Sequence, residues 1–157
     1  MKLIRKMPLV HLCILGILCT SCYKEVSEEF VGNWETDLIR VEIPLKEVDG
    51  SEDLVFDSVS MGLLISADKT ASGYIGMASF TDVRVMKNTG DAENKGLAYV
   101  VKCGELGKIF PNDPVVSKKI EIWLKPVEGS TMGTEINYKW GDWFPFMIAD
   151  PEFQKVE

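Results

Sequence analysis

The sequence predicts an all-β protein, an antiparallel up-and-down β-barrel of about eight strands, with a β-sandwich as the alternative. Apolar and polar residues alternate in several runs, which is the period of strands with one face toward a core and one toward water. The clearest runs lie at residues 39–46, 59–65, 97–103, 120–125 and 135–140. Turn-forming residues separate them at short intervals, and no long stretch has helical spacing. Hairpins are therefore expected between neighbouring strands.

The individual strands follow from this pattern in chain order. They are expected near residues 31–37, 38–46, 53–66, 73–80, 81–87, 97–103, 118–125, 134–140 and 143–148. At the start of the domain, the apolar phase set by Trp34 does not match that of Ile39. This mismatch predicts a β-bulge near Asp37 or Leu38.

Two small residues bear on whether the barrel is hollow. Gly76 and Ala78 share the expected inward phase of Tyr74 and Phe80. A barrel of about eight strands is either filled by side chains or wide enough for one ligand. Small inward residues favour a cavity, and the pattern alone leaves both cases open.

The first 21 residues have the pattern of a secretory signal peptide. Lys2, Arg5 and Lys6 form a basic start, and an apolar run over residues 7–18 follows without an acidic residue. The run is too short for a membrane-spanning helix, which needs about 20 apolar residues. The segment is therefore assigned to targeting rather than to the fold.

The end of this segment, Cys-Thr-Ser-Cys at residues 19–22, resembles a bacterial lipobox, with Cys19 where Leu is usual. The resemblance implies cleavage after Ser21 and acylation of Cys22, which becomes a membrane anchor. An ordinary signal peptide cleaved near Ser21 is the alternative. Residues 22–29 are then a polar tether, and residues 30–157 form the barrel domain.

The tether carries a second resemblance. Lys24, Glu25, Glu28 and Glu29 follow Cys22 directly and resemble the export signal of lipoproteins in Bacteroidetes-type bacteria. This resemblance implies a lipid-anchored protein of the outer membrane that faces the cell surface, with the periplasmic face as the alternative.

The charge and the rare residue types exclude several functions. A formal net charge of −7 argues against a nucleic-acid partner. The one histidine, His11, lies in the signal segment, so the exported part lacks the usual general base of nucleophilic catalysis and the common zinc ligands. No glycine-rich nucleotide loop is present. We therefore expect no enzyme activity, no cofactor and no metal.

Two weaker features are interpreted as structural. The acidic residues Asp49, Glu52, Asp53 and Asp57 form a solvated loop in the favoured interpretation, and a weak calcium site in the other. Cys103 lies on the apolar face of its strand and is expected to be buried rather than redox-active.

The start of the domain, Phe-Val-Gly-Asn-Trp at residues 30–34, resembles the Gly-x-Trp motif of lipocalins. Residues 64–73 resemble a hairpin of small lipocalin-like bacterial lipoproteins, with Lys69 in place of the family's usual Gly. The resemblance implies a barrel that binds a small apolar or glycan-like molecule in its interior or mouth. Trp34 is expected to close one end, and Gly32 to allow a close backbone approach.

Aromatic residues are the candidate binding side chains. Trp140, Trp143, Phe144 and Phe146 crowd around a Gly-Asp turn near the C-terminus, and some of them are expected at a barrel mouth. Trp123 lies on the polar phase of its strand, as a cross-strand contact or a docking surface. If the barrel is filled, the protein is instead a structural component that docks an envelope protein.

Overall fold

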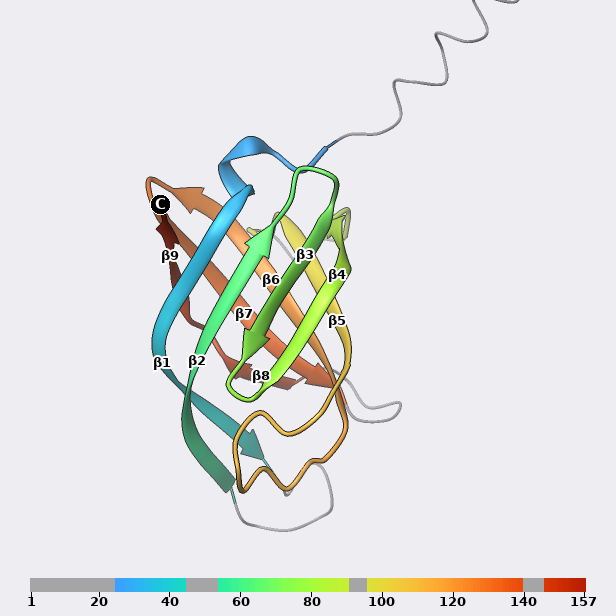
Figure 1. Cartoon of the computed structure of the whole chain (residues 1–157), viewed down its shortest axis with the longest axis vertical. Coiled ribbons are helices and arrows are strands. Elements are labelled where there is room, and N and C mark those ends of the chain that lie inside the picture. The colour runs from blue at the N-terminus through green and yellow to red at the C-terminus, as the bar shows by residue number, and fades with distance from the viewer. Residues whose placement is uncertain (1–24, 45–53, 91–95, 140–145) are drawn as a thin grey trace, which may run out of the picture.

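Nine strands and one short helical turn make up the computed structural model, which describes residues 25–44, 54–90, 96–139 and 146–157 (Figure 1). The elements are η1 (Glu28–Phe30), β1 (Gly32–Pro44), β2 (Leu54–Ile65), β3 (Thr70–Ile75), β4 (Ala78–Lys87), β5 (Tyr99–Leu106), β6 (Lys118–Glu128), β7 (Thr131–Lys139), β8 (Phe146–Ala149) and β9 (Glu152–Val156).

The strands close into an eight-stranded antiparallel up-and-down barrel, lipocalin-like in arrangement, and the fold prediction is confirmed. Strands β1 to β7 pair in sequence order, and β9 pairs with both β7 and β1 to complete the ring. Strand β8 pairs with β7 beyond the β9 pairing, so β8 and β9 share the eighth position. All these pairings are antiparallel, as expected of strands joined by hairpins.

The predicted bulge is confirmed in β1. Thr36 pairs with Met61 and Ile39 pairs with Val59, so two residues of β1 stand opposite one residue of β2. The bulge restores the inward phase on both sides of it, and β1 is therefore one strand where the sequence predicted two. Leu38, inside the bulge, is 73% exposed.

The β3–β4 hairpin differs from the prediction. Its turn lies at Gly76 and Met77, in the middle of the expected strand 73–80. Gly76 has a φ of +54°, and a Cβ there would lie 2.0 Å from the carbonyl oxygen of Ile109. Tyr74 is exposed. Gly76 thus serves a turn and a close backbone contact, so the inward phase assigned to it and to Tyr74 was wrong.

The C-terminal strands also differ. Strand β8 is described from Phe146, because residues 143–145 of the expected strand lie outside the described residues, and β9 was not predicted. Of the β9 side chains only that of Phe153 is buried. A single buried side chain in five residues gives no alternation to detect.

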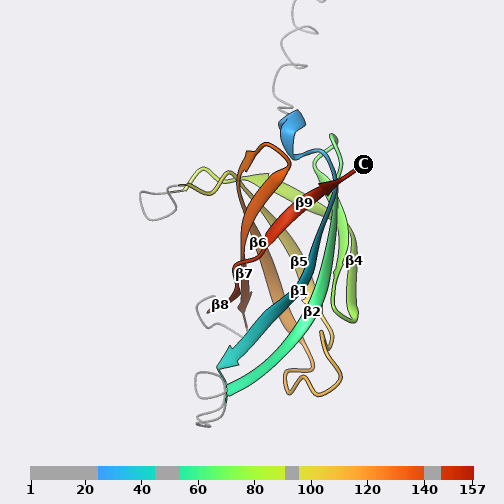
Figure 2. The same ribbon diagram turned by 90° about the vertical axis from the view of Figure 1, so that its left-hand side faces the viewer.

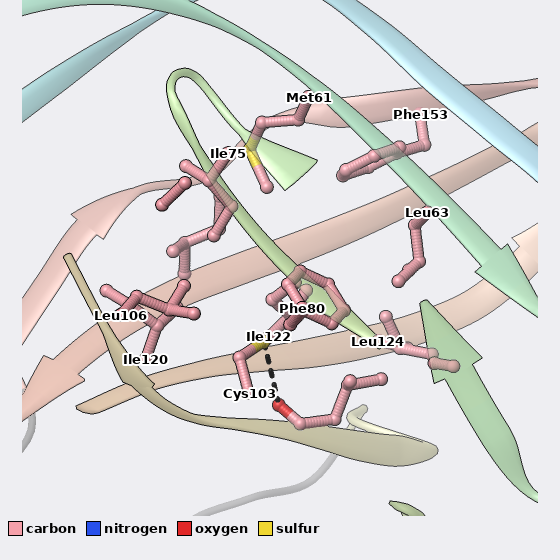
Figure 3. Packing of buried hydrophobic residues seen from close by; sticks show 14 of the residues in the cluster. Met61, Leu63, Ile75, Phe80, Cys103, Leu106, Ile120, Ile122, Leu124 and Phe153 are labelled. Atoms are coloured by element: carbon pink, nitrogen blue, oxygen red, sulfur yellow. Dashed lines mark hydrogen bonds between the residues drawn. The ribbon is translucent and has the colours of Figure 1, made fainter. Parts of the chain in front are cut away.

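Side chains fill the described interior. Trp34, Met61, Ile75, Ile122 and Phe153 come from different strands, and each is 0% exposed. No water-sized void therefore adjoins them. Figure 3 shows labelled side chains from β2, β3, β4, β5, β6 and β9 pointing toward one another in this core. Of the two cases left open by the sequence, the described part of the barrel is the filled one.

One end of the barrel is closed by the loop over residues 107–117, shown at the bottom of Figure 1. Ile109, Phe110 and Val115 of this loop are buried in the core. Lys118 and Asp113 are each 1% exposed, and the Lys118 Nζ lies 2.5 Å from the Asp113 Oδ2. We call this region the closed end.

The buried pair orders the loop around it. The Asp113 carboxylate accepts hydrogen bonds from the backbone N–H groups of Ile109 (2.9 Å) and Val115 (3.0 Å). The Lys118 Nζ donates to the Val115 carbonyl oxygen at 2.6 Å. Burial lowers the pKa of Lys118, and the Asp113 carboxylate opposes that shift. The charges are thus compensated within the loop, as a buried pair requires.

Candidate ligand-binding site

The end opposite the closed end is crossed by the N-terminal segment, residues 25–30 (Figure 2). We call this end the mouth. Val26 and Phe30 of the segment are buried. The Phe30 ring packs edge-on against Tyr99 with centroids 4.8 Å apart. The Tyr99 hydroxyl lies 3.2 Å from the Ser27 backbone N and 3.0 Å from its Oγ. Val26 and Ser27, expected to belong to a tether, therefore contact the barrel.

Trp34 lies directly beneath this segment. Its Nε1 donates a 2.8 Å hydrogen bond to the Phe30 carbonyl oxygen. The Nζ of Lys155 lies 5.2 Å from the Trp34 ring centroid and 3.4 Å from the Glu29 carbonyl oxygen, which it can reach as a donor. Trp34 therefore joins the N-terminal segment, the core and the last strand at the mouth.

Gly32 makes room for this arrangement. Its φ is +136°, a conformation that side chains rarely adopt, and an added Cβ would lie 2.8 Å from the Lys155 Cε. The close neighbour is thus a lysine side chain, where the sequence had suggested neighbouring backbone.

A cavity of about 580 Å³ opens beside the N-terminal segment. It is lined by residues 25–27, Lys69 of the β2–β3 turn, residues 84–87 of β4 and Tyr99 of β5. Its volume lies within the range of small-molecule sites, about 300–1,000 Å³. We call it the mouth cavity. Because the core below it is filled, a ligand here would lie across the mouth rather than along the barrel axis.

The mouth cavity combines an apolar wall with positive charge. Val26, Val85 and Tyr99 are buried, and Met86, which follows Val85 in β4 and pairs with Val100, is half-buried. The charged side chains along the lining are Lys69, Arg84 and Lys87, together with Glu25. Cations thus dominate this site in a chain whose net charge is −7.

Lys69 stands in a left-handed conformation, with a φ of +69°. Its backbone N–H donates to the Ser66 carbonyl (3.2 Å), and its own carbonyl accepts from the Val85 N–H (2.8 Å). The neighbouring Asp68 carboxylate accepts from the backbone N–H and the hydroxyl of Thr70. The turn fixes a backbone geometry that Gly adopts without strain, at the position where the similar hairpins have Gly.

The aromatic residues predicted to bind a ligand do not line this cavity as far as they are described. Trp140, Trp143 and Phe144 lie outside the described residues, as do Cys22 and Asp49, Glu52 and Asp53 of the acidic cluster. Phe146 begins β8 and pairs with Tyr138 of β7.

Trp123 is described, and it lies elsewhere. It is half-buried on the outer face of β6, between Val100 of β5 and Glu135 of β7. Val100 is only 5% exposed although it lies outside the core cluster. This outer position agrees with a cross-strand contact, and it is also compatible with a docking contact.

The remaining candidate groups have structural surroundings. Cys103 is buried, and burial raises the pKa of its thiol to about 12. Over the described ranges, no group of three or more His, Cys, Asp or Glu side chains could hold a metal ion. No helix in the described residues is long and apolar enough to span a membrane.

The fold and the mouth together define a filled eight-stranded lipocalin-like barrel with a cationic cavity at one end. Comparison of the chain with protein-family models, curated proteins and solved structures gave no match.

Proposed function

We propose that the protein is a non-enzymatic envelope lipoprotein of the lipocalin-like bacterial type, anchored to the outer membrane, which binds a small apolar or glycan-like molecule at its mouth. The observation that carries this proposal is the cavity of about 580 Å³ with a partly apolar wall. The filled core supports the mouth, rather than the interior, as the place of binding.

The anchor and the cavity belong to the same end of the barrel in this proposal. Only Tyr23 and Lys24 separate Cys22 from Glu25, the first residue of the cavity lining. An extended chain spans about 3.3–3.6 Å per residue, so a lipid on Cys22 would hold the mouth close to the membrane surface. A ligand could then pass between membrane and cavity over a short distance.

Anchoring is tested with Cys22→Ser, expressed with the chain's own leader. Acyl chains contribute about 0.8 kcal/mol per buried CH₂, far more than a short polar segment can. The wild type is expected to sediment with membranes after a salt wash, and the variant to remain in the supernatant. A variant that still sediments would refute lipid anchoring.

Binding is tested by thermal shift of the full chain carrying Cys22→Ser. The panel contains fatty acids, sterols, bile acids and oligosaccharides. A ligand at a hundredfold excess over its Kd stabilises the native state by about 2.7 kcal/mol.

Two variants locate the site. Val26→Ala changes the cavity wall and should reduce the shift, whereas Met77→Ala alters an exposed residue of the β3–β4 turn and should not. If no compound stabilises the protein, or if both variants act alike, ligand binding at the mouth is wrong.

The second candidate function is docking of an envelope protein through the outer face around Trp123. The supporting observation is a half-buried indole beside a buried valine outside the core. Trp123→Ala should then abolish capture of a specific envelope protein in crosslinking, while Val26→Ala, at the mouth cavity, leaves capture unchanged. The opposite pattern would exclude this face.

A further inference from the structure

We infer that the mouth cavity takes a compact amphiphile with an anionic headgroup, held by Lys69, Arg84 and Lys87. The inference rests on the proposed function and narrows it from a small apolar or glycan-like molecule to one ligand class. The shared chemistry is an anionic oxygen group, such as a carboxylate or phosphate, on a single apolar body.

Apolar and charged side chains lie next to one another in the cavity lining. Val26, Val85 and Tyr99 form its buried wall. The Tyr99 hydroxyl is engaged by Ser27, so the wall owes little to that polar group. These three side chains expose only 4%, 2% and 7% of their surface, so an apolar body here covers a small apolar patch while its headgroup remains among the cations.

The cations of the cavity lining differ from other cations in the chain in their partners. Ion pairs within the described ranges engage Arg40, Lys102, Lys118 and Lys125. Across those same ranges, neither the Arg84 nor the Lys87 side chain is engaged by an ion pair or a hydrogen bond. A chain rich in carboxylates thus leaves two cations available where the cavity lies. An anionic headgroup would supply their partner, and Arg84 can hold it with two parallel hydrogen bonds.

The backbone of Lys69 has a conformation that also points to a function for its side chain. A left-handed φ is unfavourable for a residue with a Cβ, and Gly would relieve the strain. Backbone strain of this kind concentrates at functional sites. A lysine here places a cation on the cavity lining that glycine could not provide.

The size of the cavity restricts the apolar body. Below the wall the core is filled, with Trp34 and Leu124 at 0% exposure. A long chain could not follow the barrel axis and would leave methylene groups in water. A body short enough to fit about 580 Å³, such as a ten-carbon chain, is therefore favoured over a long lipid tail.

The test compares three probes of equal chain length that differ in headgroup charge: decanoate, decanol and decyltrimethylammonium. Each is titrated by calorimetry, below its aggregation limit, into the full chain with Cys22→Ser. Decanoate should bind at least tenfold more tightly than decanol, and the cation should bind most weakly. Raising the salt concentration should weaken decanoate binding and leave decanol unchanged.

Three variants assign the headgroup contact. Arg84→Gln and Lys87→Gln should each weaken decanoate binding about tenfold, the loss expected of a charge-assisted hydrogen bond. Decanol binding should not change. Lys119→Gln, at an exposed residue outside the cavity lining, is the matched control and should bind like the parent.

The outcomes separate the two proposals. If decanoate and decanol bind equally and the variants have no effect, the anionic headgroup is refuted and the proposed binding function stands. If no probe binds and the compound panel also fails, both are refuted. If the protein binds vesicles of anionic phospholipid but not monomeric decanoate, the occupant is a membrane surface and the small-ligand inference is wrong.

Discussion

The two ends of the barrel use charged side chains in opposite ways. At the closed end, the charges of Asp113 and Lys118 are fully buried and satisfied by each other and by loop backbone groups. At the mouth, Arg84 and Lys87 are exposed beside a cavity. The first arrangement satisfies both buried charges internally and closes the core. The second leaves charge beside apolar side chains, which supports the binding proposed for the mouth.

This contrast predicts its largest effect at the closed end. Lys118→Met leaves the Asp113 carboxylate buried without its counter-ion and should lower the free energy of unfolding by about 3–5 kcal/mol, measured by urea denaturation. The control is Lys102→Met, which breaks an exposed pair with Glu121 and should lose no more than about 1 kcal/mol. Equal losses would show that the closed end does not depend on its buried charge.

At the mouth, a loss of similar size is expected from Trp34→Ala. The substitution opens a cavity in the core and removes the hydrogen bond to Phe30, and should lower the free energy of unfolding by about 3–5 kcal/mol. Trp123→Ala, on the outer face, should lose clearly less. If Trp34→Ala lowers the free energy of unfolding by less than about 1 kcal/mol, the residues of the Gly-x-Trp motif have no structural role here.

The bulge in β1 and the loop of the closed end differ in how far the sequence could predict them. The bulge between Thr36 and Ile39 was predictable because it shifts an apolar phase that is visible in consecutive residues. The loop over residues 107–117 has no regular spacing of apolar residues. The buried Lys118 that follows it cannot be told from a surface lysine in the sequence. The sequence therefore could not predict that this loop closes one end of the barrel.

The mouth cavity was missed for a related reason. It joins four segments, around Ser27, Lys69, Arg84 and Tyr99, that are separated along the chain. None of them has an unusual composition. One signal was present: Lys69 replaces the Gly of similar hairpins, and a strained lysine is a reason to ask what its charge does.

A smaller loss of stability is expected where Tyr99 contacts the N-terminal segment. Tyr99→Phe keeps the ring against Phe30 but removes the hydroxyl that contacts Ser27. The free energy of unfolding should fall by about 0.5–1.5 kcal/mol. The rate of amide hydrogen exchange should rise in residues 25–30 before it rises in the strands. Tyr74→Phe, at an exposed tyrosine, is the control. Unchanged exchange in Tyr99→Phe would mean that burial of Val26 and Phe30 alone holds the segment.

The smallest change in stability is expected from a substitution of Lys69. This substitution tests the contrast between the closed end and the mouth most sharply, because stability and ligand affinity should change in opposite directions. Lys69→Gly relieves a left-handed φ of 69°, which costs about 1–2 kcal/mol, but adds the backbone entropy of glycine to the unfolded chain. The net expected gain in stability is about 0.5–1 kcal/mol. The same change removes one cation from the mouth cavity, so decanoate affinity should fall while decanol affinity is kept.

Lys69→Asn is the matched control for that variant, because asparagine tolerates the left-handed conformation but carries no charge. It should lose decanoate affinity as Lys69→Gly does. If both variants are more stable and bind decanoate as well as the parent, the lysine serves neither fold nor ligand, and the charge at the mouth must be assigned to Arg84 and Lys87 alone. If Lys69→Gly is instead less stable than the parent, the lysine side chain stabilises the turn by more than its backbone strain costs. The mouth would then resemble the closed end, with a charge retained for the fold.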